Sequence, residues 1–231
     1  VSLVPSVTET LLAWGVTPEA CTRFCEQPDL PHVGGTKDPD VAAIVDLRPD
    51  LVVMCVEENR REDADALARA GVPTTALSID AVGDVAPALR TLARLVGVDA
   101  ARVEEPVTDP PGAAVGPQLR AFVPIWKRPW MSLAGGTYGS SLLAAIGVHN
   151  VFADALSRYP EVTLDDARAR RPEVVLAPSE PYPFRERHVP ALEAVAPVVL
   201  VDGQDLFWWG ARTPAAMERL REQLRPSSAG G

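Results

Sequence analysis

The stretch Val41-Ala-Ala-Ile-Val-Asp-Leu-Arg-Pro-Asp-Leu-Val-Val-Met54 decides the fold. Asp40 precedes it as an acidic helix cap, and the helix is predicted to end at Arg48-Pro49 because proline cannot continue it. The apolar run that follows is typical of a strand buried in a parallel sheet. The same order returns in residues 164–177, with arginine and proline again separating helix from strand. A helix, a proline break and a buried strand, present twice, predict an α/β fold with parallel sheets.

Two further pairs of segments repeat in the same order. Thr10-Leu-Leu-Ala-Trp-Gly-Val16 resembles Leu142-Leu-Ala-Ala-Ile-Gly-Val148, and Ala70-Gly-Val-Pro73 resembles Ala194-Val-Ala-Pro197, each before a predicted strand. One such pair is common in α/β proteins, but three in one order indicate an internal repeat. We therefore expect two copies of one lobe.

The repeat predicts where the lobes begin and end. An N-terminal α/β lobe is expected over residues 1–80 and a C-terminal α/β lobe over residues 118–231. The intervening residues 81–117 are predicted to hold an amphipathic helix at 84–96 and a Pro/Gly-rich linker at 106–117. A chain of 231 residues is long enough for two lobes of about 100–120 residues each.

Composition excludes several classes of function. The net charge is −9, and the densest basic stretch, Arg168 to Arg171, is balanced by nearby acids, which argues against nucleic acid as a partner. No apolar run approaches the roughly 18–20 residues that span a membrane. The three cysteines cannot form a disulfide framework and are predicted to be structural or pocket-wall thiols, so no metal site or cofactor is expected.

The start of the chain predicts a short strand and then a helix. Ser6-Val-Thr-Glu9 has the form of a capping box, in which a hydroxyl and a carboxylate bind the first free amides of a helix. Trp14 is predicted to lie in the core, and Gly15 suits the left-handed residue that ends the helix.

Catalytic patterns are weak, and a non-enzymatic protein is predicted. Ser140 lacks the Gly-x-Ser-x-Gly elbow of a hydrolase. The histidines are predicted to be ordinary surface or loop residues: His32, His149 and His188. A metal-inserting chelatase on the same scaffold stays open as an alternative, and it would require a histidine beside Glu57 or Glu58.

Aromatic side chains gather in segments that follow predicted strands. Four of the five tryptophans lie in two such segments, Trp126 with Trp130 and Trp208 with Trp209. The first lobe instead offers one aromatic, Phe24, and a charged segment after residues 51–54, namely Glu57, Glu58 and Arg60. Large planar side chains with a few polar groups are typical of a small-molecule site, and ligands of open α/β sheets bind at the carboxyl ends of the strands.

These motifs together resemble a known family. Val1-Ser-Leu-Val-Pro-Ser-Val-Thr-Glu-Thr10, Gly34-Gly35, the stretch at 41–54, Gly136-Thr-Tyr138 and Asn150-Val-Phe-Ala-Asp154 resemble the helical-backbone (class III) substrate-binding proteins of ABC importers. The cobalamin-binding branch is most similar, with iron-siderophore and haem binders next. The resemblance covers nearly the whole chain except the linker.

The resemblance implies two Rossmann-like lobes joined by an interlobe helix, with a metal chelate held in the cleft between them. By position it assigns ligand contacts to Phe24, to Tyr159 and to the pair Trp208 and Trp209. With the aromatic and charged residues found above, the predicted ligand-binding set is Phe24, Glu26, Glu57, Glu58, Arg60, Trp126, Trp130, Tyr138, Tyr159, Tyr182, Phe184, Trp208 and Trp209. A cobalamin-like corrinoid is the expected ligand, with ferric siderophore or haem as alternatives.

The chain departs from the family pattern where a permease would dock. Family members carry a glutamate early in the helix before each Arg-Pro-Asp, where it meets arginines of the permease. Here the two positions hold Ala42 and Asp165. No export leader or lipobox is visible. The resemblance implies a monomeric, extracytoplasmic and membrane-associated import protein. The departures at Ala42 and Asp165 and the missing leader leave a cytosolic transporter-independent binder or sensor as the alternative.

Overall fold

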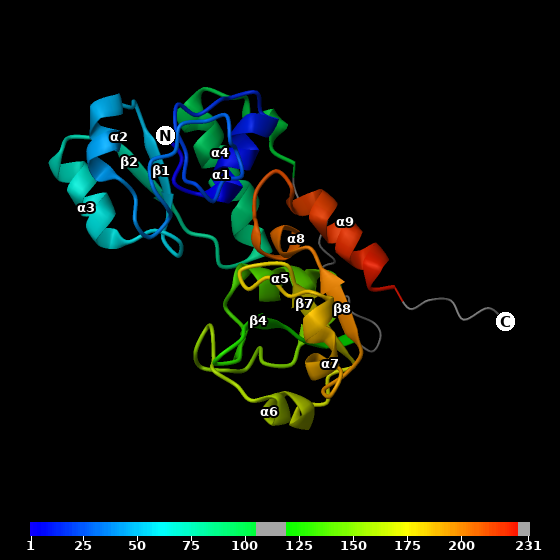
Figure 1. Cartoon of the computed structure of the whole chain (residues 1–231). Helices are drawn as coiled ribbons and strands as arrows, with labels where there is room; N and C mark the ends of the chain where they lie inside the picture. Colours follow the sequence, from blue (N-terminus) through cyan, green and yellow to red (C-terminus); the bar gives the residue numbers. More distant parts are fainter. Residues whose placement is uncertain (105–118, 226–231) are drawn as a thin grey trace. The chain divides into compact units, whose positions relative to one another are not determined.

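The computed structural model describes residues 1–104 and 119–225, so the predicted linker at 106–117 lies outside the described residues. The chain divides into two compact units (Figure 1). Unit 1 holds Val1–Ile79, residues 83–104 and Trp209–Ala211. Unit 2 holds Asp80–Val82 and residues 119–208 and 212–225. Residues 83–104, part of the predicted interlobe segment, thus belong to unit 1.

Unit 1 is built on a parallel sheet. Strand β1 (Val52–Cys55) pairs in parallel with β2 (Thr74–Leu77). Single parallel bridges extend the ladder from Val53 to Ser2, from Ser2 to Cys21, and from Cys21 to His32. The helices of unit 1 are α1 (Pro5–Ala13), α2 (Val41–Leu47), α3 (Arg61–Arg69), nearly all of α4 (Val82–Val96) and the short 3₁₀ helix η1 (Ala100–Arg102).

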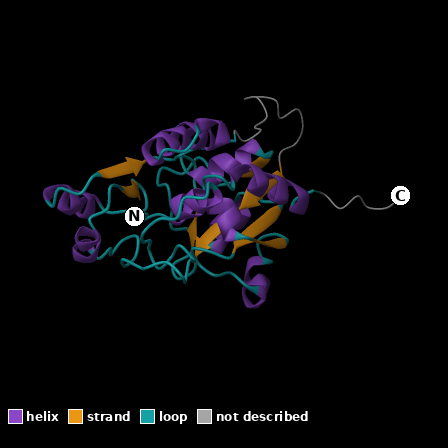
Figure 2. Cartoon of the chain, turned by 90° about the horizontal axis from the view of Figure 1, so that it is seen from above, coloured by secondary structure: helices purple, strands orange, loops and turns teal. Residues whose placement is uncertain are grey.

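Unit 2 has a four-stranded parallel sheet in the order β6-β3-β7-β8. Its strands are β3 (Leu119–Phe122), β6 (Val148–Asn150), β7 (Val174–Pro178) and β8 (Val198–Val201), with a small antiparallel pair β4 (Pro124–Trp126) and β5 (Met131–Ser132). Its helices are α5 (Tyr138–Ala145), α6 (Leu164–Ala169), η2 (Glu186–His188), α7 (Val189–Leu192), α8 (Gly203–Phe207) and α9 (Thr213–Gln223). In Figure 2 the strands of this unit lie between helices.

The two sheets confirm the internal repeat. If the bridge at His32 is set aside and the strands of each parallel sheet are numbered along the chain, the second lies at one side of the first, and the third and fourth follow on the other side. Only unit 1, among the described residues, adds a further edge position, at His32. Strand order is set by long-range pairing, so the agreement is independent of the sequence echoes that predicted it.

Backbone geometry repeats as well. Arg48 and Arg171, which precede the two helix-breaking prolines, both adopt left-handed conformations with φ of 51° and 52°. Gly15 and Gly147 end equivalent helices with φ of 78° and 81°. A left-handed residue turns the chain out of a helix, and glycine adopts it without the steric cost that arginine carries.

The core of each unit lies between its sheet and its helices. Equivalent positions face inward in both copies: Ile44 on α2 and Ala167 on α6 are fully buried, as are Val52 on β1 and Val175 on β7. Burial of one large aliphatic side chain contributes about 1.5–3 kcal/mol. Trp14 is also buried, as predicted from its place among leucines.

One predicted helix start is wrong. The helix begins at Pro5 with Val4 as its N-cap, and no side chain caps it. Pro5 fixes the φ of the first helical position and needs no amide partner, so the helix starts before Ser6 can act as a cap. The capping-box chemistry occurs instead at α6, where Thr163 and Asp166 bond each other's backbone amides.

Candidate functional site

The loops that follow the parallel strands of unit 1 meet at one edge of its sheet, and Asn59 joins three of them. Its Oδ1 accepts from the amide of Cys55 at 2.7 Å, where β1 ends. Its Nδ2 donates to the carbonyls of Leu3 at 3.2 Å and Thr36 at 2.9 Å, which follow the strand positions at Ser2 and His32. Asn59 therefore holds together the starts of the three loops whose side chains lie at this edge.

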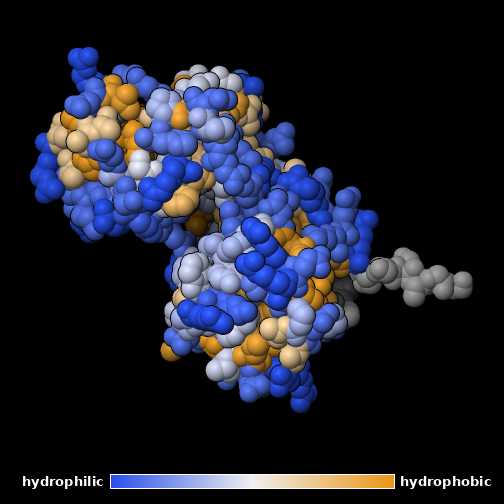
Figure 3. Space-filling view, viewed as in Figure 1, coloured by the Kyte–Doolittle hydropathy of each residue, from blue (hydrophilic) through white to orange (hydrophobic). Residues whose placement is uncertain are grey.

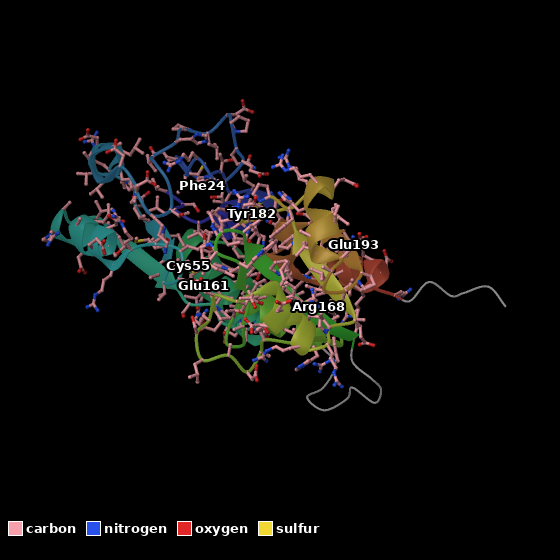
Figure 4. The ribbon with its side chains drawn as sticks, turned by 60° about the horizontal axis from the view of Figure 1, so that its bottom comes forward. Phe24, Cys55, Glu161, Arg168, Tyr182 and Glu193 are labelled. Carbon is pink, nitrogen blue, oxygen red and sulfur yellow. The ribbon has the colours of Figure 1, made fainter. Side chains whose placement is uncertain are left out.

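Two apolar side chains are exposed at this edge. Phe24 is 50% exposed and Val56 is 62% exposed. The guanidinium of Arg23 lies 4.8 Å from the Phe24 ring centre and donates to both carboxylate oxygens of Asp38 at 2.9 Å. Arg23 thus contacts the Phe24 ring while half of the residue stays exposed. Figure 4 labels Phe24 among the side chains of the N-terminal loops. Val56 was not predicted as a site residue, and its place directly after β1 is the signal that could have found it.

The charged residues of this edge differ in their hydrogen-bond partners and in their burial. Lys37 donates from Nζ to the backbone carbonyl of Glu57 at 2.7 Å, which ties the two loops together. Arg60, predicted to meet a ligand, binds both carboxylate oxygens of Asp63 at 2.9 Å at the start of α3. The side chains of Glu57 and Glu58 are half-buried, and Glu26 is exposed. We name Phe24, Val56, Glu57 and Glu58, with Arg23 and Lys37, the unit 1 edge.

The cysteines are interior residues of unit 1. All three are buried and free of disulfides. Burial raises the pKa of Cys21 to about 12, with Cys25 beside it adding to the effect, and raises the pKa of Cys55 to about 11. The thiols of Cys21 and Cys55 therefore remain protonated at neutral pH.

Unit 2 carries an aromatic cluster at the carboxyl ends of β3 and β7. Its members are Trp126, Trp130, Tyr182, Phe184 and His188. Trp126 meets Tyr182 edge to face at 5.6 Å between ring centres, and Trp130 stacks on Phe184 at 6.1 Å with their planes 4° apart. Such pairs fix ring orientation, because the edge of one ring is attracted to the face of the other.

The cluster has an exposed part and a buried part. Trp126 is 43% exposed, and Tyr182 and Trp130 are half-buried. Phe184 is buried in the core of the unit. Lys127 places its ammonium 5.4 Å from the Trp130 ring centre. The rings available to a ligand are therefore Trp126, Tyr182 and Trp130, with Phe184 packed behind them.

Two other residues that were predicted to contact a ligand, Tyr138 and Trp209, are also buried. Tyr138 is buried, and its hydroxyl lies 2.9 Å from that of Thr213. Trp209 is buried as well, whereas Trp208 is half-buried with the guanidinium of Arg212 5.3 Å from its ring centre. Tyr138, Trp209 and Phe184 cannot touch a ligand unless the side chains around them move.

A separate loop of unit 2 carries the last predicted aromatic. Tyr159 is 36% exposed, and Leu156 nearby is fully exposed. Arg158, between them, forms an ion pair with Asp80 at 2.7 Å. Beside this loop, a shallow cavity of about 570 Å³ is lined by Phe152, Asp154, Ala155, Pro160, Glu161, Val162, Asp166, Ala169 and Arg170.

The three histidines lie in different parts of the fold. The Nε2 atom of His32 lies 3.0 Å from the carbonyl of Gln27, and His149 lies on β6. His188 was predicted to be a surface residue, and this is wrong, because it is only 5% exposed inside the aromatic cluster. Within the described parts of the chain, no group of three or more His, Cys, Asp or Glu is placed to hold a metal ion.

The positions equivalent to the permease-docking glutamates are on the surface. Ala42 lies early on α2 and Asp165 early on α6, and both are exposed. The carboxylate of Asp165 accepts from Arg168 at 2.9 Å. The visible face of the molecule is mostly hydrophilic, with separate hydrophobic areas (Figure 3). No helix within residues 1–104 or 119–225 is both long and apolar enough to cross a bilayer.

Comparison with known proteins is consistent with this architecture. Residues 1–109 match the family model described as periplasmic binding protein. Vitamin B12-binding proteins of Vibrio parahaemolyticus and Pectobacterium carotovorum are 26% and 23% identical over 76% and 100% of this chain, and over 68% and 89% of their own lengths.

Solved structures show the same fold. The periplasmic vitamin B12 binding protein of Vibrio cholerae superposes with a TM-score of 0.77 at 21% identity, covering 97% of this chain and 95% of its own. A periplasmic haem-binding protein of Pseudomonas aeruginosa gives a TM-score of 0.79 at 19% identity, covering 98% and 92%. The predicted fold class is confirmed: the chain has the fold of the helical-backbone (class III) periplasmic binding proteins, and residues 1–109 match the periplasmic binding protein model.

Proposed function

We propose that this protein is a non-enzymatic solute-binding protein that captures a bulky metal chelate of the cobalamin or haem type for ABC import. One observation carries the proposal: each unit exposes aromatic surface at the carboxyl edge of its parallel sheet, Phe24 in unit 1 and Trp126 in unit 2. Open α/β sheets bind ligands at this edge. The relatives named as vitamin B12-binding and haem-binding have the same fold, which supports a large planar ligand.

The chemistry of the two surfaces fits such a ligand. A corrin or porphyrin presents an apolar face and polar groups around its rim. Trp126 and Tyr182 offer ring surface at small conformational cost, because each aromatic side chain has only two rotatable bonds. The unit 1 edge offers Phe24 and Val56 for apolar contact, and Lys37 and Glu58 lie nearby to meet polar rim groups.

Tryptophan fluorescence titration with cyanocobalamin, haemin and a ferric siderophore tests the proposal. Saturable quenching by at least one of them is expected, because Trp126 lies on the proposed surface. Phe24→Ala and Trp126→Ala should each weaken binding, whereas Leu95→Ala should not, since Leu95 is an equally exposed apolar residue on α4. Absence of a saturable response to all three ligands would refute the ligand class.

The partner and the compartment are part of the same proposal. Import requires docking to a permease, and the surface positions at Ala42 and Asp165 offer one acid instead of two. We infer an extracytoplasmic protein that docks mainly through unit 2. Fractionation of the native cells, with antibody against this chain, tests the compartment: recovery only with cytoplasmic markers would favour a transporter-independent binder or sensor.

A further inference from the structure

His188 is a buried titratable residue at the centre of the aromatic cluster, and its ring nitrogens have defined partners. Nδ1 accepts a hydrogen bond from the backbone amide of Arg185 at 3.0 Å. Nε2 accepts from Nε of Arg187 at 3.3 Å and lies 3.4 Å from the hydroxyl of Tyr182. An N–H donor thus faces each ring nitrogen, and the neutral ring keeps one of its two nitrogens as an acceptor.

A second proton on His188 has no place in this arrangement. It would leave an N–H at both nitrogens, which face the N–H of Arg185 and the Nε–H of Arg187, so neither hydrogen bond could form. The charged groups that act on the ring are cationic: Lys127 from the turn between β4 and β5, and Arg187 and Arg185 from η2 and its cap. Burial first, and then these three cations, lower the pKa of His188 below its usual value.

His188 is connected to the exposed ring surface through one side chain. The imidazole contacts Tyr182 edge to face at 5.4 Å between ring centres, and Tyr182 contacts Trp126 in the same manner at 5.6 Å. Phe184 contacts His188 from another side at 5.6 Å. A change in the charge or position of the imidazole therefore reaches Tyr182 directly and Trp126 through it.

We propose that His188 is a positioning residue: in its neutral form it holds Tyr182 against Trp126, and its protonation on acidification releases this ring pair and weakens ligand binding. This inference rests on the proposed function, because it concerns the same aromatic surface. The inference goes beyond the proposed function, because it makes the position of the ligand-facing rings depend on pH.

The first experiment needs no ligand. The protein is labelled with fluorotryptophan, the Trp126 resonance is identified with the Trp126→Phe variant, and fluorine NMR spectra are recorded from about pH 7.5 to about pH 5. The Trp126 signal is expected to move with the protonation of His188, at a midpoint below the ordinary histidine value of about 6.5. His188→Asn should abolish this movement, because asparagine offers an acceptor near the place of Nδ1 but does not titrate. His32→Asn is the matched control and should leave it intact.

The second experiment measures affinity for cyanocobalamin and haemin over the same pH range. The wild-type protein should bind about threefold to tenfold more weakly at the acid end, as expected for the loss of one aromatic contact. His188→Asn should show a flat profile. Tyr182→Phe keeps the ring but removes the hydroxyl, and it should reduce the pH effect without abolishing binding.

The outcomes separate this inference from the proposed function. A Trp126 resonance that does not move with pH, or one that moves equally in His188→Asn, would overturn the positioning role. Binding that is lost at every pH, together with a Trp126 signal that still follows His188, would refute the ligand class and leave the positioning role standing. If His188→Asn does not fold, the wild-type imidazole titration and the Tyr182→Phe variant still decide the question.

Discussion

Replacement of Asn59 by alanine should destabilise unit 1 strongly, although residue 59 belongs to no helix or strand. The side chain is 8% exposed and makes three hydrogen bonds to backbone groups that are 4, 23 and 56 residues away in sequence. Alanine removes all three bonds. It also leaves the amide of Cys55 and the carbonyl of Leu3 buried without that partner.

The expected loss in the free energy of unfolding follows from the backbone groups that would be left buried without a partner. A buried backbone group that loses its only partner costs about 1–3 kcal/mol. The Cys55 amide and the Leu3 carbonyl are in buried surroundings, whereas the Thr36 carbonyl is partly buried and can bind water after the substitution. We therefore expect a loss of about 3–4 kcal/mol in the free energy of unfolding, against a typical total of about 5–15 kcal/mol.

The assay is urea unfolding followed by circular dichroism, combined with amide hydrogen exchange. Two units can unfold separately, so a single transition is not assumed. The exchange rate of the Cys55 amide is a local measure, because this amide donates to Asn59. Glu62→Ala is the control: Glu62 is exposed on α3, and its loss should change stability by less than about 0.5 kcal/mol.

The reasoning would be refuted if the free energy of unfolding and the exchange rate of the Cys55 amide both changed little. A loss below about 1 kcal/mol, less than one well-made hydrogen bond is expected to contribute, would mean that the three contacts do not fix the loops. Unchanged protection of the Cys55 amide in the same variant would show that another group takes the place of the Asn59 oxygen. Faster exchange at Cys55 with a large loss of stability would support the assignment.

Three further outcomes are expected. Phe24→Ala should leave stability nearly unchanged, because the ring is half exposed, but should weaken binding of the fluorescence-quenching ligand about fivefold or more. Gly210→Ala should lower the melting temperature, since the new Cβ would clash with Oγ1 of Thr10 and φ at this position is +126°. Asp205→Asn should cost about 3 kcal/mol in urea unfolding, because it removes the charge of a buried carboxylate that pairs with Arg219 and with the largely buried Arg212; a loss below about 1 kcal/mol would contradict this.

Much of the fold could be predicted because its signals are local. The helix over residues 41–47 ends at the predicted place, before Arg48-Pro49. Asp40 caps this helix as predicted, by accepting from the amide of Ala43 at 3.0 Å. Caps, prolines and left-handed residues act within a few positions of themselves, so their effect can be inferred from the residues nearby.

The candidate site was harder to predict, because exposure depends on distant contacts. Trp126 and Phe184 both follow strands and are both aromatic, yet one is exposed and the other buried. What separates them is packing: Phe184 stacks on Trp130 and also contacts His188. Sequence gave no signal for the burial of His188, since its neighbours Arg185 and Arg187 are charged and indicated a surface segment.

The two units share a framework and differ in the loops that the framework carries. Ile44 and Ala167 face inward at equivalent places, and Arg48 and Arg171 turn the chain alike, because the core requires both features. The loops beyond the strand ends are less constrained, since loop side chains such as Phe24 and Trp126 lie at the surface, although Phe184 reaches the core of its unit. One copy accordingly carries a charged edge around Phe24 and the other carries an aromatic cluster. A shared core with independent loops therefore lets one framework present two different surfaces.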